Sequence, residues 1–349
     1  MADIDITGAA NWSTCKTGSI PPAAGDTVFL NTGGTLTLDG TSATYTCVAI
    51  KQATSAAPTT YDQTGIIAMA AGGDAAPTIA ANLIAGAADM ITLAAGANKT
   101  LTITGTVTGG STASKRGIYV SGGTHVLNVT ACVGGAANSA HGIRVDGGTV
   151  TGTIETATGS ATAAAYGAYC NSSGMSSTIT NAVGGAYAGA YGVQLQNGTL
   201  AITNSTGSSA AASSGIIVGS GTHTITNATG GGVTGSYGVL ASGGTTTITT
   251  AKGGTVTGAL GAGGTSGTLI INGTNLTGTG YPVGTHGATV KVAAGVKLQF
   301  SNVSAALTKY YDPTLMPAVG AVLLNTSYGG GDYLGTLAGV RRGGALRGA

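Results

Sequence analysis

The string GIYVSGG at residues 117–123 opens a series that decides the fold. Related strings follow it along the chain: GIRVDGG at 142–148, GAYCNSS at 167–173, GVQLQNG at 192–198, GIIVGSG at 215–221 and GVLASGG at 238–244. Their first residues are separated by 25, 25, 25, 23 and 23 positions. A nearly constant period of this length is the sequence signature of a solenoid built from stacked repeats.

A second register supports the same period. The central apolar residue of the next short strand recurs every 23 to 26 residues, at Ile79, Ile103, Val129, Ile154, Ile179, Ile202, Ile225, Ile248 and Ile271. Apolar residues alternate with small polar ones between Gly, Ser and Asn turns, a pattern that favours strands over helices. The sequence therefore predicts an all-β parallel β-helix, or β-solenoid, with about 23–26 residues per coil and capped ends. Roughly ten coils between Ile66 and Phe300 would make a rod of order 50 Å.

Equivalent residues of stacked coils should form columns. Two columns are apolar and are expected to face the interior: Ile118, Ile143, Ala168, Val193, Ile216 and Val239, and then Val120, Val145, Cys170, Leu195, Val218 and Ala241. Asn181, Asn204 and Asn227 recur at one position of successive coils, and we expect them to point inward near a corner. Stacked amides in such a column form a hydrogen-bonded ladder, which is a structural device.

The composition fits a thin core. Gly supplies 64 of 349 residues and hydrophobic residues 42%, but there are only two Phe and one Trp. The net charge of +2 is small and the basic residues are scattered, so no nucleic-acid partner is expected. The N-terminus lacks a signal-peptide pattern, and no run of 18 apolar residues occurs. We therefore expect no membrane partner and a soluble protein made in a cytoplasm.

Residue types that carry chemistry are sparse. Asp146 and Glu155 are the only carboxylates between positions 90 and 311, too few for the paired acids of polysaccharide cleavage. The cysteines show no C-x-x-C spacing, which favours buried thiols over a Cys15–Cys47 disulfide and disfavours metal binding for all four, including Cys132 and Cys170. These patterns predict a protein that is not an enzyme and has no catalytic residues, no cofactor and no metal.

The histidines are interpreted as ordinary surface or turn residues. His125 and His223 hold similar places four coils apart, about 19 Å at the usual strand spacing, so they cannot share a metal. His286 is isolated in the sequence. His141 shares a column with three tyrosines, Tyr166, Tyr191 and Tyr237.

One outward column is unusually aromatic and apolar for a surface facing water. It consists of Tyr119, Arg144, Tyr169, Gln194, Ile217 and Leu240. A long stripe of this kind suggests a partner, and we expect another copy of the chain. The Arg144 guanidinium should lie between the two tyrosine rings in a cation–π contact. The alternative is that these side chains only shield the backbone.

A T-x-T pattern marks the neighbouring strand. It occurs as Thr178 with Thr180, Thr224 with Thr226, and Thr247 with Thr249, with a partial match at Thr102 and Thr104. Outward threonine pairs on a flat sheet resemble the ice-binding face of some β-solenoids. Asn128, Glu155 and Ala201 interrupt the array, and Thr is in any case a favoured strand residue, so ice binding is the weaker interpretation.

The ends of the chain differ from the repeats. Residues 1–64 are interpreted as an N-terminal cap with the first coils, 65–304 as the parallel β-helix, and 305–349 as a C-terminal cap or assembly arm. The last segment has the aromatic and arginine content of an interface, in Tyr310, Tyr311, Tyr328, Tyr333, Arg341, Arg342 and Arg347. A disordered basic tail is the alternative for this segment.

Both ends carry a family resemblance. The string WSTCKTGSIPPAAGDTVFLNTGGTLTLDG at 12–40 resembles the opening coils of β-helix proteins from bacteriophage genomes and bacterial surfaces. The matching residues are Trp12, Gly18, Pro21 or Pro22, Gly25, Asp26, Val28, Leu36, Leu38 and Asp39. The string PAVGAVLLNTSYGGGDYLGTL at 317–337 is similar to the closing motif of phage virion-associated repeat proteins, through Val322, Tyr328, Gly329 and Gly335 to Leu337.

The resemblance implies a bacteriophage virion component, either a capsid decoration protein or a fibre, assembled in the host cytoplasm. It also implies a homotrimer in which β-helices stand side by side and contact the major capsid protein or other virion proteins. A bacterial surface filament or adhesin is the runner-up. A tailspike depolymerase is weakened by the shortage of carboxylates.

Overall fold

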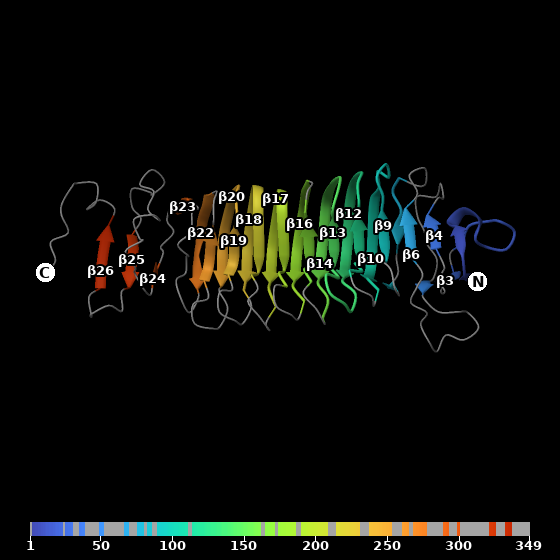
Figure 1. The fold of residues 1–349 in the computed structure, drawn as a ribbon, viewed down its shortest axis with the longest axis horizontal. Coiled ribbons are helices and arrows are strands. Elements are labelled where there is room, and N and C mark those ends of the chain that lie inside the picture. The colour runs from blue at the N-terminus through green and yellow to red at the C-terminus, as the bar shows by residue number, and fades with distance from the viewer. Residues whose placement is uncertain are drawn as a thin grey trace.

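The computed structural model is a parallel β-solenoid, as the repeat predicts, with its strands stacked along one long axis (Figure 1). It contains no α-helix in the described part of the chain. The structure describes residues 2–23, 25–30, 35–38, 49–51, 66–69, 75–79, 82–85, 89–110, 114–161, 165–171, 174–185, 190–208, 214–230, 237–252, 260–264, 268–277, 289–292, 299–300, 321–325 and 332–336.

The strands of the N-terminal part are short and are followed by the longer strands of the central coils. They are β1 (Asp3–Ile6), β2 (Ala9–Asn11), β3 (Thr27–Leu30), β4 (Thr35–Leu38), β5 (Ala49–Lys51), β6 (Ile66–Met69), β7 (Thr78–Ile79), β8 (Leu83–Ile84), β9 (Ile91–Leu93), β10 (Thr100–Thr108), β11 (Ile118–Val120), β12 (Thr124–Val133), β13 (Ile143–Val145) and β14 (Thr149–Thr158). A single 3₁₀ turn, η1 (Trp12–Thr14), follows β2.

The second half continues the same stack and ends in a small separate sheet. Its strands are β15 (Ala168–Cys170), β16 (Met175–Val183), β17 (Val193–Thr206), β18 (Ile216–Thr229), β19 (Tyr237–Ala241), β20 (Thr245–Lys252), β21 (Leu260–Gly264), β22 (Thr268–Thr277), β23 (Thr289–Val292), β24 (Gln299–Phe300), β25 (Ala321–Asn325) and β26 (Asp332–Thr336). β25 pairs with β24 in parallel and with β26 antiparallel.

The register confirms the predicted interior columns. Each residue of the first column pairs with the next one along the stack. The column consists of Ile118, Ile143, Ala168, Val193, Ile216 and Val239, on β11, β13, β15, β17, β18 and β19. Every residue of this column and of the column that begins at Val120 is at most 1% exposed. Because each parallel strand buries the same face as its neighbour, a thin core of small aliphatic side chains runs along the axis.

The predicted asparagine ladder is also present. Asn204 Nδ2 donates to Asn181 Oδ1 at 2.9 Å, and Asn227 Nδ2 donates to Asn204 Oδ1 at 3.0 Å. The three side chains are partly buried, and each lies just before a buried small residue of the same strand, Ala182, Ser205 or Ala228. They tie β16, β17 and β18 together beside the backbone hydrogen bonds.

The corners leave no room for side chains at the glycine that begins each repeat. A Cβ atom on Gly142 would lie 2.7 Å from the carbonyl oxygens of both Cys132 and Gly167. Real Cβ contacts are almost never that short, so the close stacking of neighbouring coils requires glycine here. The repeated glycine seen in the sequence is therefore a packing requirement.

Asp26 organises the N-terminal segment. Its carboxylate accepts hydrogen bonds from the backbone N–H of Ala2 at 2.7 Å and of Ala23 at 2.9 Å, and it pairs with Lys16 Nζ at 2.6 Å. The Lys16 hydrogen bond, followed by that from Ala23, lowers the pKa of Asp26 to about 2. Trp12 is buried next to this region. The G-D step of the N-terminal motif thus has a structural role.

Candidate functional site

The outward column expected to mediate self-association is continuous in the structure. Tyr119 lies in register with Arg144, Tyr169, Gln194, Ile217 and Leu240 on successive coils. All six side chains are partly exposed. We call these residues the lateral column. Because they stand on a sheet of parallel strands, they form a straight stripe along the rod.

The first coils of the lateral column form an aromatic cluster with two arginines. The Arg144 guanidinium carbon lies 5.2 Å from the centre of the Tyr169 ring, as predicted. At Tyr119, however, the cation over the ring is Arg116, whose guanidinium carbon lies 4.4 Å from the ring centre. The sequence interpretation did not include Arg116. Arg144 Nε also donates to both carboxylate oxygens of Asp146, at 2.8 and 2.9 Å.

A second stack of rings runs beside the lateral column. His141 and Tyr166 stack with centroids 4.8 Å apart, and Tyr166 and Tyr191 with centroids 5.0 Å apart. The Tyr169 ring of the lateral column lies 5.0 Å from His141 and so joins the two stacks. The rings at this end of the lateral column are therefore held in place by contacts with the neighbouring stack of rings.

His141 is not a surface residue, contrary to the sequence interpretation. It is only 3% exposed, and its Nδ1 accepts a hydrogen bond from the backbone N–H of Tyr166 at 2.9 Å. Burial, together with the nearby Arg144 and Arg116 guanidinium groups, lowers the pKa of His141 to about 3. The ring is neutral at physiological pH and serves the aromatic stack.

The interpretation of His125 and His223 as surface or turn residues is also wrong. Both are fully buried, and burial is the main cause that lowers the pKa of each. His125 Nε2 lies 2.8 Å from the carbonyl oxygen of Gly122. His223 stands in register between Leu200 and Thr246 in an interior column. His286 lies outside the described residues.

The remaining candidates for chemistry stay apart. Asp146 is bound to Arg144, whereas Glu155 is exposed on β14. Within the described ranges, no group of three or more His, Cys, Asp or Glu side chains could hold a metal ion. Cys15, Cys132 and Cys170 are thiols rather than disulfides, and Cys47 lies outside the described residues.

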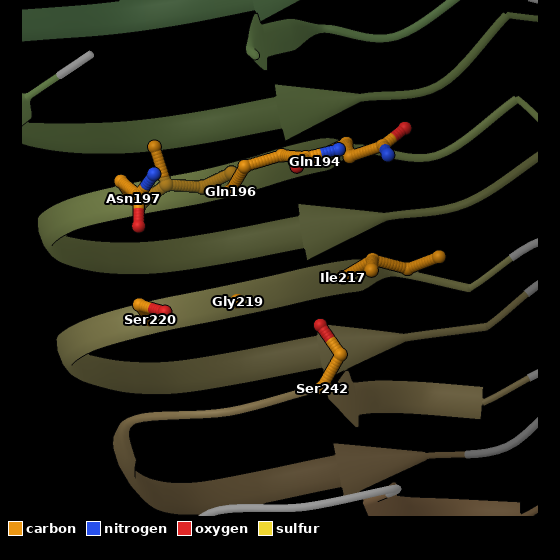
Figure 2. A pocket seen from close by; sticks show the side chains of 8 residues that line it. Gln194, Gln196, Asn197, Ile217, Gly219, Ser220 and Ser242 are labelled. Carbon is orange, nitrogen blue, oxygen red and sulfur yellow. The ribbon is translucent and has the colours of Figure 1, made fainter. Parts of the chain in front are cut away.

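A recess lies at the C-terminal half of the lateral column and includes its Gln194 and Ile217, and the sequence did not indicate it. Its volume is ≈ 280 Å³. Figure 2 shows side chains from neighbouring coils around it. The lining consists of Gln194, Leu195, Gln196 and Asn197 on β17, Ile217, Gly219 and Ser220 on β18, and Ser242 after β19.

The threonine pattern occupies the neighbouring face. Thr178, Thr224 and Thr226 are exposed, and the first two belong to one column that continues to Thr247. Ala201 stands between Thr178 and Thr224 in that column. The array is thus interrupted in space as it is in sequence.

The C-terminal arm is mostly outside the described residues. Of the residues expected to form an assembly interface, only Tyr333 lies in a described strand, β26, where it pairs with Leu324. Tyr310, Tyr311, Tyr328, Arg341, Arg342 and Arg347 fall in ranges that the structure does not describe.

Comparison with protein-family models, with curated proteins and with solved structures finds no match to this chain. Among the described residues, no helix has the length and hydropathy needed to cross a membrane.

Proposed function

We propose that this chain is a non-enzymatic structural protein that forms a stiff rod and joins copies of itself through the lateral column. The observation that carries the proposal is the unbroken register of the lateral column from Tyr119 to Leu240. A straight, partly exposed stripe on a rigid sheet can meet the same stripe on a parallel neighbour over many coils at once.

The chemistry of the lateral column supports a contact between copies. Tyr and Arg are enriched at protein interfaces. A tyrosine supplies a large contact area with few rotatable bonds, and an arginine supplies a planar group that forms several hydrogen bonds. The ion pair with Asp146 and the ring stack around His141 already hold Arg144 and Tyr169 in place. Association through them would therefore immobilise few side chains, which lowers its entropic cost.

Within this proposal, the rod is a virion component, a capsid decoration protein or fibre subunit, and the closed assembly is a homotrimer. This part depends on the resemblance of the two terminal strings to phage β-helix proteins. The terminal segment that docks onto capsid or other virion proteins would be one of the two ends, and we favour the C-terminal arm because of its Tyr and Arg content. A bacterial surface filament remains the second candidate, because a parallel solenoid can also extend by open-ended contacts.

The lateral contact is tested by light scattering of the purified full chain, with negative-stain images of the same fraction. We expect a closed oligomer for the native sequence and a monomer for Tyr119→Glu. The acidic side chain would lie near Arg116 and Arg144 as well as Asp146, and position 119 is partly exposed, so the variant is expected to fold. Thr104→Glu is the matched control, because it places the same charge at an exposed position of β10.

The possible results separate the candidates. A native monomer, or an equal loss of mass in both variants, would refute the lateral contact. Open-ended polymers of the native chain would favour the filament. The virion assignment is tested separately, by searching for the chain in the mass spectra of particles purified from lysed cells of its source.

A further inference from the structure

We propose that the recess on the C-terminal half of the lateral face binds a neutral carbohydrate chain. The recess is lined by polar side chains from three successive coils, as Figure 2 shows for Asn197, Ser220 and Ser242. This function goes beyond the structural role proposed above and does not depend on it.

The recess coincides with a change in the length of the coils. The interval from Cys170 to Ile179 is nine residues, but that from Leu195 to Ile202 is seven. The next interval, from Val218 to Ile225, is also seven residues. In these shorter coils β17 and β18 run through the corner as single strands, whereas earlier coils break there into two strands. The recess therefore lies at coils whose corner is two residues shorter.

Glycine makes this tight path possible. Gly198 and Gly221 lie in register and have φ values of 131° and 119°, which L side chains rarely adopt. A Cβ on Gly219 would lie 2.3 Å from the carbonyl oxygen of Gln196, so this position is also restricted to glycine. The floor of the recess is therefore a closely packed, preformed backbone surface.

The lining carries polar groups that the fold does not use. The side chains of Gln194, Gln196, Asn197 and Ser220 make no hydrogen bond or ion pair with the described part of the chain. Each amide offers both a donor and an acceptor, and the hydroxyl offers the same. By contrast, the nearby asparagines of the ladder are bonded to one another.

The chemistry of the lining selects a class of ligand. No charged side chain lines the recess, so neither an anion nor a cation would find a partner there. Ile217 adds an apolar patch, and the ring of Tyr169 stands one coil away, in register with Gln194. Paired donors and acceptors beside the single partly exposed apolar side chain of Ile217 suit a molecule with many hydroxyls and few charged groups, which is a neutral sugar.

Gln194 and Ile217 belong to both the recess and the lateral column. A lateral contact that extended over all six residues of the lateral column would cover the recess, so sugar binding and self-association compete for this end of the lateral column. A second copy seated in the recess is the competing occupant, and the experiment must distinguish it from a sugar.

The test uses the intact chain and a panel of neutral hexasaccharides, namely maltohexaose, cellohexaose, laminarihexaose and mannohexaose. Saturation-transfer NMR detects binding, and titration gives the dissociation constant. We expect at least one hexasaccharide to bind at millimolar or lower concentration. Gln196→Ala combined with Asn197→Ala should weaken that binding by about tenfold or more, because two amide partners are removed.

Asn128→Ala is the matched control, since this exposed asparagine lies on the threonine-rich face. It should leave the dissociation constant unchanged. Failure of all four sugars to bind, or equal binding by the double variant, would overturn the proposal. A double variant that alters the oligomeric mass while sugar binding is absent would assign the recess to a second copy and would also overturn it. A change in oligomeric mass would extend the contact between copies to the recess, whereas loss of sugar binding alone would leave the result of the Tyr119→Glu test unchanged.

Discussion

Acidification should destabilise the rod through His141. The ring is buried and neutral, with a pKa of about 3, whereas in the unfolded chain it would titrate near its ordinary pKa of 6.5. As the pH falls below 6.5, His141 binds a proton in the unfolded chain but not in the folded chain. The free energy of unfolding therefore decreases over the window from pH 6.5 down to about pH 3. Acidification lowers the free energy of unfolding because the pKa of His141 in the folded state lies below its value in the unfolded chain.

The expected loss follows from this window. Each pH unit inside it corresponds to about 1.4 kcal/mol, so lowering the pH from about 7.5 to about 4.5 should cost about 2 to 3 kcal/mol from His141. Arg144 and Arg116 oppose protonation of the ring, while Asp146 favours it. Protonation would also remove the acceptor for the backbone N–H of Tyr166.

The assay is urea unfolding followed by far-ultraviolet circular dichroism at the two pH values. His141→Asn keeps an acceptor near the Tyr166 N–H but cannot take up the proton, so its loss of stability on acidification should be smaller by that amount. Tyr191→Asn, in the same ring stack, controls for lost stacking and should retain the native pH dependence. The reasoning fails if His141→Asn loses as much stability as the native chain. A residual slope is expected because His125 and His223 also have lowered pKa values.

Three further substitutions test the packing and the cap. Asn204→Ala removes both ladder hydrogen bonds and should lower the free energy of unfolding by about 1 to 3 kcal/mol, measured by urea denaturation; an unchanged midpoint would contradict the ladder's role. Gly142→Ala should cost about 1 to 3 kcal/mol or more through overpacking, whereas Gly8→Ala, with no atom within 4 Å of its added Cβ, should be nearly neutral. Asp26→Asn weakens the links to Lys16 and Ala23 and should speed proteolysis within the N-terminal segment, seen by mass spectrometry; equal cleavage rates would argue against it.

The threonine-rich face leads to a last expectation. Because Ala201 separates Thr178 from Thr224, the native chain should not inhibit ice recrystallisation in a splat-cooling assay. Clear inhibition of ice recrystallisation would instead support ice binding by the threonine-rich face.

The interior could be predicted from the sequence because a solenoid converts sequence spacing directly into spatial neighbours. Once the period is known, Ile118 must stack on Ile143, and no long-range information is needed. The same logic places Asn204 between Asn181 and Asn227. The histidines could have been assigned by the same rule, since His223 lies two positions before the inward Ile225 and therefore on the same side of the strand.

The lateral surface could be predicted only in part. The residues of the lateral column follow from the period, but the contact of Arg116 with Tyr119 depends on a side chain that reaches across from the corner. The recess lies at the coils whose corner is two residues shorter, and its form depends on how side chains of three coils are arranged there. The shift from 25 to 23 in the repeat spacing was the available signal, but spacing alone does not determine the resulting shape.

That change in coil length also gives the rod a direction. Because the corners of the coils that contain β13 and β15 are two residues longer than those of β17 and β18, the coils do not all have the same outline along the rod. Two rods lying side by side in the same direction would meet equal cross-sections at every level, whereas opposed rods would match wide levels with narrow ones. Self-association of the kind proposed should therefore give polar bundles, with all N-terminal segments at one end and a single kind of surface at each tip.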